Sequence, residues 1–281
     1  MRIVAHASDL HFGRDDPLLA EALLDELGDL RPALVIVSGD LTQRARRAEF
    51  RATAAFLRRL PAPWLAVPGN HDVPLWDVAR RFLSPLGRYR RWVAAEVDPF
   101  FQDRELAVQG LNTARSATWK EGRISREQIR ALRGRLAPLP QGLCKILVTH
   151  HPFIPPPADP GAAIVGRGQE ALRAAEASGV DLLLAGHLHL GYSADVRAHH
   201  TVIQRSMLSI QAGTAISTRV REHPNGYNVL TVELPRLTLE VRSWDGGGFA
   251  ARTERRYRKI GGEWTREEAP VGSGGPAPAD G

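Results

Sequence analysis

Short apolar runs alternate with segments of helical periodicity through the first 190 residues, and this alternation restricts the fold more than any other feature of the chain. Strands are predicted at residues 2–7, 33–37, 64–67, 106–111, 145–149 and 181–185. Helices are predicted from Asp15-Asp16-Pro17 onward, over 46–60, from the Ser125-x-x-Gln128 capping box to Leu136, and over 169–178. Strand–helix–strand units of this kind build a parallel sheet, so the sequence predicts an α/β protein.

The pattern changes after residue 200. Strands joined by short turns are predicted at 201–210, 226–234 and 237–244, and the second of them alternates apolar and polar residues as a half-buried antiparallel strand does. From Thr265 the chain is rich in Gly, Pro and Ala and has no periodicity. We therefore expect one folded domain over residues 1–264 and a disordered tail over 265–281.

Composition excludes several classes of protein. Cys144 is the single cysteine, so neither an intrachain disulfide nor a cysteine-based zinc site is possible. The apolar runs are too short to span a membrane and no signal-peptide core follows Arg2, so we expect no membrane span and a cytoplasmic location. The net charge is +6, with basic clusters at 44–47, 88–91 and 252–259. These clusters either attract phosphate-bearing partners or form a solvated surface, and the sequence favours the surface.

Polar side chains follow each of five predicted strands at its carboxyl end. The clusters are Asp9-Leu10-His11, Gly39-Asp40, Gly69-Asn70-His71-Asp72, His150-His151 and Gly186-His187-Leu188-His189. Each cluster alone has an ordinary explanation, such as a turn or a buried histidine. Ligands of open α/β sheets bind beyond the carboxyl ends of the strands, however, and burying so many polar groups without a ligand would be costly. The five clusters together therefore predict one assembled site.

The residue types at this site indicate metal binding. Carboxylate oxygens, imidazole nitrogens and an amide oxygen suit divalent Mn, Fe, Zn or Co. The candidate ligands number seven, more than one ion needs: Asp9, His11, Asp40, Asn70, His150, His187 and His189. A carboxylate shared between two ions would complete two coordination shells, and such a pair is the usual arrangement for in-line displacement at phosphorus.

The ordered set of motifs resembles the calcineurin-like metallophosphoesterases. The matching residues are Asp9-x-His11, Gly39-Asp40, Gly69-Asn70-His71-Asp72, His150 and Gly186-His187-x-His189. Within that superfamily, the Gly-Asn-His-Asp motif and the compact size are most similar to the class III cyclic-nucleotide and glycerophosphodiester phosphodiesterases. The resemblance implies a four-layer αββα sandwich of two mixed β-sheets flanked by helices, and it makes residues 1–264 a metallophosphoesterase catalytic domain.

The resemblance also implies a role for each motif residue. Asp9, His11 and His189 would hold one metal ion, and Asn70, His150 and His187 would hold the other. Asp40 would bridge the two ions. His71 would contact the phosphate and assist the leaving group without binding metal.

The expected activity is hydrolysis of small phosphodiesters, of cyclic-nucleotide or glycerophosphodiester type, by in-line attack of a metal-bridging hydroxide. The two cations outweigh the negative charge of Asp9, Asp40 and the hydroxide, which leaves a net positive site for a phosphodiester anion. We expect His71, Asp40 and Asp72 to be the catalytic residues. Asp72 either orients His71 or stabilises its own turn, and the sequence does not separate these roles.

Residues between the third and fourth clusters are less constrained. Asn112, Thr113 and Arg115 follow a predicted strand and can reach a substrate, although a surface role is favoured for Arg115. His151 is either a supporting group or a substrate contact. Three tryptophans, which we expect to pack in the core rather than to stack on a base, are Trp76, Trp92 and Trp119.

Other activities fit the same motifs. A metal-dependent nuclease is one alternative, because DNA-repair exonucleases of the superfamily show similar motifs, but the sequence shows no separate nucleic-acid-binding module. A phosphomonoesterase is another alternative. A non-catalytic interaction protein would be expected to lose metal ligands or His71, and this chain retains them all. The expected partner is a small-molecule phosphodiester rather than a nucleic acid.

Overall fold

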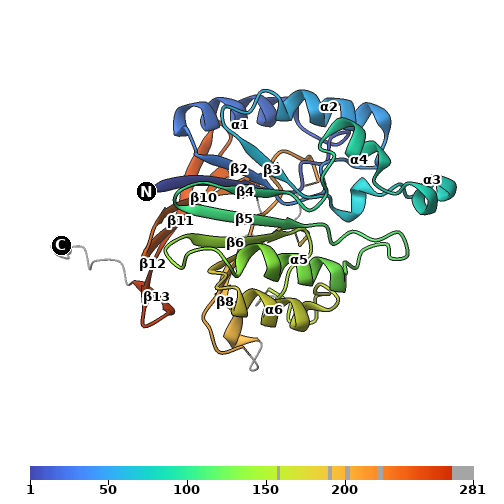
Figure 1. Ribbon diagram of the computed structural model, residues 1–281. Coiled ribbons are helices and arrows are strands. Elements are labelled where there is room, and N and C mark those ends of the chain that lie inside the picture. Colours follow the sequence, from blue (N-terminus) through green and yellow to red (C-terminus); the bar gives the residue numbers. More distant parts are fainter. Residues whose placement is uncertain (157–158, 189–191, 200–202, 220–223, 268–281) are drawn as a thin grey trace, which may run out of the picture.

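The computed structural model describes residues 1–156, 159–188, 192–199, 203–219 and 224–267. Two mixed β-sheets lie face to face, and α-helices cover their outer faces (Figure 1). This is the four-layer α/β arrangement expected above. No helix in the described part of the chain is long and apolar enough to cross a membrane.

The first sheet has seven strands in the order β13-β12-β11-β10-β1-β2-β3. β1, β2 and β3 are parallel and β10 to β13 are antiparallel. The bounds are β1 Arg2–Ala7, β2 Leu34–Val37, β3 Trp64–Ala66, β10 Gly226–Glu233, β11 Arg236–Trp244, β12 Phe249–Ile260 and β13 Glu263–Glu267.

The second sheet has six strands in the order β4-β5-β6-β7-β9-β8. Its four central strands are parallel, with an antiparallel strand at each edge. The bounds are β4 Phe100–Gln102, β5 Leu106–Leu111, β6 Cys144–Thr149, β7 Leu182–Ala185, β8 Tyr192–Asp195 and β9 Leu208–Gln211.

The helices lie in two layers. The bounds are α1 Pro17–Leu30, α2 Arg47–Leu57, α3 Val78–Leu83, α4 Gly87–Trp92, α5 Arg126–Leu136 and α6 Gly168–Ala177, with 3₁₀ turns η1 Asn70–Asp72 and η2 Val196–Ala198. α1 and α2 cover the first sheet and α5 and α6 the second, while α3 projects from the body (Figure 1). The Ser125 side chain accepts from the Gln128 N–H, so the predicted capping box opens α5.

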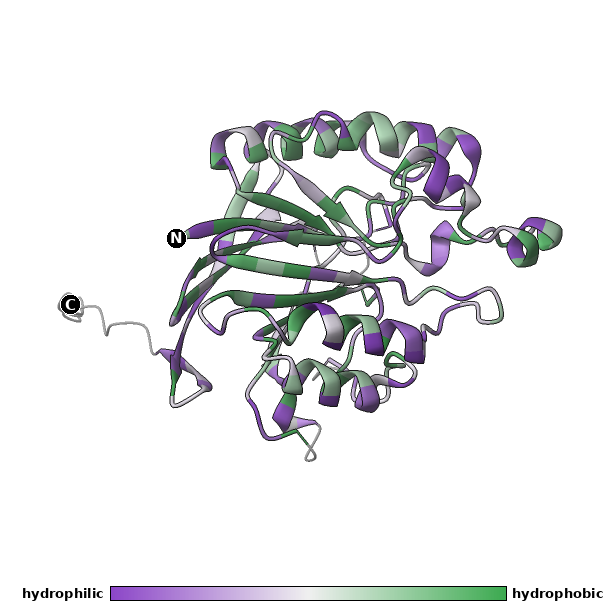
Figure 2. Ribbon diagram, viewed as in Figure 1, coloured by the Kyte–Doolittle hydropathy of each residue, from purple (hydrophilic) through white to green (hydrophobic). Residues whose placement is uncertain are grey.

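Three apolar cores follow from the alternation of side chains along each strand. Val4 of β1 joins Ile146 and Leu184 of the other sheet in a core between the sheets. The neighbouring residue Ala5 faces the opposite way and packs in the core beneath α1 and α2. A third core lies between the second sheet and α5 and α6. Figure 2 shows the result, with hydrophobic strands inside and helices that carry hydrophilic residues along one side.

Two boundaries predicted from the sequence are wrong. The predicted strand at 201–210 begins only at Leu208, and 201–202 lie outside the described residues. The Gln204 and Arg205 N–H groups donate to the Glu176 carboxylate, both at 2.7 Å, instead of to a neighbouring strand. The domain also extends beyond residue 264, because β13 pairs with β12 as far as Glu267. The remainder of the expected tail, 268–281, lies outside the described residues.

Candidate metal centre

The predicted polar clusters meet at one edge of the two sheets. Asp9 and His11 follow β1, Asp40 follows β2, and Asn70 lies in η1 after β3. His150 and His187 follow β6 and β7 of the other sheet. Donor atoms of Asp9, Asp40 and His150 lie within 4.8 Å of one another, and so do those of His11, Asp40 and His71. The site is therefore built from both sheets.

Asp40 lies between two groups of metal-donor atoms. Its Oδ1 is 3.3 Å from His150 Nε2, and its Oδ2 is 3.7 Å from His11 Nε2. The residue is almost fully buried. Burial by itself raises the pKa of the Asp40 carboxyl, but attraction to His150, His71 and His11 outweighs burial and holds the pKa well below its usual range. Asp40 is therefore an anion in contact with both groups.

The first donor group contains Asp9 and His11. His11 Nε2 lies 3.5 Å from Asp9 Oδ1, and neither side chain is exposed to solvent. Burial disfavours the charged imidazole, yet Asp9 and Asp40 together raise the pKa of His11. Their negative charge also suits a metal ion at this point. His189, the third ligand expected here, lies outside the described residues.

The second donor group contains Asn70, His150 and His187. His150 Nε2 is 3.1 Å from Asn70 Oδ1 and 3.2 Å from His187 Nδ1. His150 Nδ1 donates to the Ser38 carbonyl over 2.8 Å, and this bond orients Nε2 toward the other donors, as is usual for a metal-binding histidine. Burial lowers the pKa of His150, but Asp40 more than compensates and raises it to about 9. The donor types and orientations fit a divalent cation.

Four of the expected ligands have a backbone conformation that side chains rarely adopt. Asp9, His11, Asp40 and His187 have φ values of 54°, 50°, 49° and 75°. Each such residue costs about 1–3 kcal/mol, so the surrounding loops must impose the conformation. Backbone strain of this kind is concentrated at functional sites, and here it lies on the residues predicted to hold metal.

Two glycines allow the loops to come together. Gly39 has a φ of 98°, and a Cβ atom there would meet the His150 ring. A Cβ atom on Gly69 would collide with Asp40 Oδ1 and the Asp40 backbone. The glycines of the Gly-Asp and Gly-Asn motifs are therefore required because His150 and Asp40 occupy the space that a side chain would need.

His71 lies at the opening of the site and is partly exposed. Its Nδ1 donates to the Gln43 carbonyl over 2.8 Å, which fixes the ring. Its Nε2 lies 4.0 Å from Asp40 Oδ2 and 3.5 Å from an Arg219 guanidinium nitrogen. Neither Gln43 nor Arg219 was predicted as a site residue, because neither lies in a recognisable motif.

Asp72 supports the turn rather than the His71 ring. Its carboxylate accepts from the Gly69, Leu41 and Thr42 N–H groups and from the Thr42 hydroxyl, at 2.8–3.1 Å. Burial, followed by repulsion from Asp40, raises the pKa of Asp72 to about 6. Of the two roles left open by the sequence, these contacts favour the one in which Asp72 stabilises its turn and joins the loops after β2 and β3.

His151 lies beside the donors but is already occupied by other bonds. Its Nε2 donates to the Lys120 carbonyl over 2.8 Å, and its Nδ1 accepts from the Thr113 hydroxyl over 2.7 Å. Burial, reinforced by His150 and His187, holds the pKa of His151 well below its usual range. His151 is therefore a neutral supporting residue that joins the loop at 113–122 to the metal centre.

An open cleft of about 640 Å³ leads to the donor atoms. Asn70 and His71 line its floor together with residues of four loops, among them Arg44, Arg219 and Trp119. The expectation that Trp119 and Trp76 pack in the core is wrong: the two residues are 60% and 75% exposed, because both lie on loops that project beyond the sheets. The cluster at 44–47 likewise contributes to the cleft, not only to the surface.

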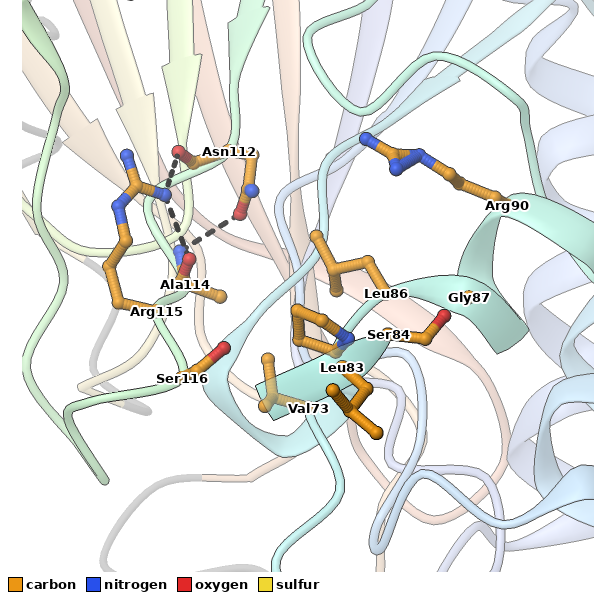
Figure 3. Close-up of a pocket in the computed structure, with 11 residues that line it drawn as sticks. Val73, Leu83, Ser84, Leu86, Gly87, Arg90, Asn112, Ala114, Arg115 and Ser116 are labelled. Atoms are coloured by element: carbon orange, nitrogen blue, oxygen red, sulfur yellow. Dashed lines mark hydrogen bonds between the residues drawn. The ribbon is translucent and has the colours of Figure 1, made fainter. Parts of the chain in front are cut away.

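A smaller cavity of about 340 Å³ adjoins the cleft at Val73 (Figure 3). Arg115 lies on its wall and donates to the Asn112 and Ala114 carbonyls over 3.0 and 2.8 Å, and to the Gln128 side chain over 2.7 Å. These bonds hold Arg115 in a structural position. The Thr113 hydroxyl also has a structural role, because it donates to His151.

Comparisons with known proteins agree with the geometry. The family model described as calcineurin-like phosphoesterase matches residues 3–191. A glycerophosphodiester phosphodiesterase, GpdQ of Enterobacter lignolyticus (strain SCF1), is 29% identical over 143 residues, which are 44% of this chain and 51% of that protein. The matched region thus spans about half of GpdQ. A probable cyclic nucleotide phosphodiesterase of Synechococcus sp. is 26% identical over 223 residues, 76% of this chain and 77% of that protein.

Two solved structures share the fold. A dimetal phosphatase from Danio rerio superposes with a TM-score of 0.63 at 15% identity, covering 90% of this chain and 98% of its own. The purple acid phosphatase PPD1 of yellow lupin superposes with a TM-score of 0.66 at 16% identity, covering 89% of this chain and 52% of its own. At these identities the likeness concerns the arrangement of sheets and helices.

Proposed function

The chain belongs to the calcineurin-like phosphoesterase family, and from that premise we propose that it is a dinuclear-metal-dependent phosphodiesterase acting on small phosphodiesters. The position of Asp40 carries the proposal. One carboxylate oxygen faces His150 and the other faces His11, so a single residue reaches both donor groups. Two divalent cations in this position would lower the pKa of a water molecule and stabilise charge on phosphoryl oxygens.

The residues that would hold the two cations are those predicted from the motifs. Asp9 and His11, with His189, would hold the first, and Asn70, His150 and His187 would hold the second. Asp40 would bridge them. Mn, Fe, Zn and Co all suit this mixture of nitrogen and oxygen donors.

His71 is proposed to handle the proton of the leaving group. Hydrolysis of a diester forms one P–O bond to a water oxygen and breaks the opposite P–O bond, and the departing alkoxide must gain a proton. The bond from His71 Nδ1 to the Gln43 carbonyl leaves Nε2 to face the cleft. A protonated Nε2 can donate to a phosphoryl oxygen or to the departing oxygen. Asp72 acts indirectly, by holding the loops of Asp40 and Asn70 together.

Small diesters are favoured by the similarity to the glycerophosphodiester and cyclic-nucleotide phosphodiesterases. The test is to load the protein with Mn, Fe, Co or Zn and to compare kcat/KM for bis-p-nitrophenyl phosphate and p-nitrophenyl phosphate. We expect the diester to be preferred. A preference for the monoester would support a phosphomonoesterase, and rapid digestion of plasmid DNA would support a nuclease.

We further propose that residues 1–267 form the catalytic domain. β12 and β13 complete the sheet that contains β1 and β2, and Tyr257 and Trp264 pack in the core between the sheets. A chain that ends at Glu267 should therefore retain full diesterase activity.

A further inference from the structure

The cleft over the metal centre has an excess of positive charge. Five cationic side chains line it, from four loops: Arg14, Arg44, Arg46, Lys120 and Arg219. Glu49 is the single acidic residue among the lining residues that the structure describes. Its carboxylate already accepts from the Arg44 and Arg46 N–H groups over 2.8 and 3.0 Å. The cleft therefore offers more positive charge than one phosphodiester anion requires.

Among the described residues, these cations are not neutralised by carboxylates, unlike some of the arginines elsewhere on the surface. Arg59 pairs with Glu21 at 2.5 Å, and Arg80 pairs with Asp77 at 2.9 Å. Within the described ranges, no salt bridge joins a carboxylate to the side chains of Arg14, Arg44, Arg46 or Lys120, and all four residues are exposed. Unneutralised cations around one concave site attract a polyanionic ligand.

An aromatic side chain is held at the same opening. Trp119 lines the cleft and is 60% exposed, and the Arg81 guanidinium lies 5.6 Å from the ring centre. The loop that carries Trp119 is fixed on both sides, because Arg81 donates to the Ser116 and Thr118 carbonyls and His151 donates to the Lys120 carbonyl. An exposed indole held in place beside cations is suited to stacking on a nucleobase.

We propose that the substrate is a nucleotide diester that carries at least one further phosphate group. The scissile diester would lie over the metal centre, the additional phosphate among Arg44, Arg46, Arg14 and Lys120, and a base against Trp119. This assignment rests on the proposed phosphodiesterase function and narrows its substrate class. A cleft of about 640 Å³ has the size of a small-molecule site.

A matched pair of dinucleotides tests the additional phosphate. ApA carries one diester charge, and pApA adds a terminal phosphate to the same molecule. We expect kcat/KM of the Mn-loaded protein to be about tenfold or more higher for pApA, because each hydrogen bond between charged groups contributes enough for such a factor. The preference should shrink as salt is raised from 50 to 500 mM. Calorimetric binding of the slowly hydrolysed phosphorothioate forms of both dinucleotides gives the same comparison without turnover.

Variants identify the residues responsible. The double variant Arg44→Gln and Arg46→Gln should reduce the pApA-to-ApA ratio to near one. Arg58→Gln is the matched control, because Arg58 is an exposed arginine at the C-terminal end of α2 that does not line the cleft. It should leave the ratio unchanged. Equal rates for ApA and pApA in the parent protein, or an unchanged ratio in the double variant, would overturn the assignment.

Trp119 is tested by its effect on substrates with and without a base. Trp119→Ala should raise KM for pApA about tenfold more than KM for glycerophosphoglycerol, within the range measured for base stacking, and Trp119→Phe should restore most of the loss. Equal effects on both substrates would contradict stacking. A protein that hydrolyses bis-p-nitrophenyl phosphate but shows none of these preferences refutes the substrate class alone, whereas one inactive on every diester refutes the proposed function.

Discussion

Asp40 is the residue on which both donor groups depend. Its two carboxylate oxygens face different histidines, and the backbone conformation that directs them is strained. The Asp40 Oδ1 atom also accepts from the His71 N–H over 2.9 Å, so the same side chain positions the proposed proton donor. One carboxylate thus connects metal binding to the geometry of catalysis.

Asp40→Ala should abolish diesterase activity and reduce the metal content from two ions per chain to less than one. Each cation would lose a ligand. The negative charge that offsets the repulsion between the two cations would also be lost. Metal content is measured by mass spectrometry after desalting, beside turnover of bis-p-nitrophenyl phosphate. Asp29→Ala, which removes an exposed carboxylate far from the site, is the control. Turnover close to that of the parent would show that Asp40 does not bridge.

His71→Ala should separate metal binding from catalysis. The ring lies beside Asp40 but is fixed by the Gln43 carbonyl, and we assign it to the substrate. We expect both metals to remain and kcat to fall about 10²- to 10⁴-fold, as for loss of a general acid. A substrate with a good leaving group, such as a p-nitrophenyl ester, should be less affected than an alkyl diester. Loss of one metal ion in this variant would identify His71 as a ligand.

His6 makes the free energy of unfolding depend on pH. It is fully buried, with Nε2 2.9 Å from the Ser38 hydroxyl, and burial lowers its pKa to about 3 despite attraction to Asp9. Between pH 6.5 and 3 the unfolded chain therefore binds a proton that the folded chain cannot. Stability from this residue is lost as the pH falls through that window, at about 1.4 kcal/mol per pH unit.

Replacement of His6 tests this effect. Urea unfolding of the metal-free protein at pH 7, 6, 5 and 4 should show a steeper loss of stability for the parent than for His6→Gln. The difference between the two proteins isolates His6 from the other histidines. If the free energies of unfolding of the parent and His6→Gln changed with pH in the same way, His6 would be able to take up a proton while the protein remains folded.

At the scale of elements, the loops after the strands could be predicted from sequence and the cleft could not. The strand ends at Asp9, Asp40 and His150 follow from local apolar runs and from the rule that parallel strands present their carboxyl ends together. The cleft depends on contacts between distant segments, such as Arg81 with the Thr118 carbonyl, which leave no local pattern. β12 was missed for another reason, because its many charged residues hide an inward-facing Tyr257.

Arg81 connects α3 to the loop that carries Trp119. It is 5% exposed and donates to the Pro74, Ser116 and Thr118 carbonyls, and burial lowers the pKa of its guanidinium. Arg81→Ala should lower the free energy of unfolding by about 2–4 kcal/mol, since three carbonyls lose a charged donor. It should also raise KM for diesters several-fold and leave metal content unchanged.

The neighbouring arginine provides the control for Arg81. Arg80 forms a surface ion pair with Asp77, and its replacement by Ala should change stability by less than about 1 kcal/mol. Thermal unfolding and steady-state kinetics of the two variants are compared directly. A loss of stability in Arg81→Ala without any change in KM would mean that the loop at 116–120 does not contribute to substrate binding.

At the scale of the whole molecule, the proposed metal centre adds to the contacts between the two sheets, which meet through an apolar core and through polar pairs such as Lys259 with Asp181 and Tyr257 with Ser193. Asp9, His11, Asp40 and Asn70 follow strands of the seven-stranded sheet, and His150 and His187 follow strands of the six-stranded one. Any cation held by Asp40 and His150 together is a link between the two halves. Binding of metal to the folded chain alone therefore stabilises the sandwich as a unit.

Removal of metal should accordingly lower Tm. At a free Mn concentration one hundred times Kd, a single site contributes about 2.7 kcal/mol, which corresponds to about 5–10 °C for a chain of this size. Calorimetry with EDTA and with MnCl₂ measures the difference. His71→Ala should show the full shift, because that residue is not assigned as a ligand, whereas Asp40→Ala should show little or none. An equal shift in all three proteins would place the stabilising metal elsewhere in the molecule and remove the physical basis for the link between the sheets.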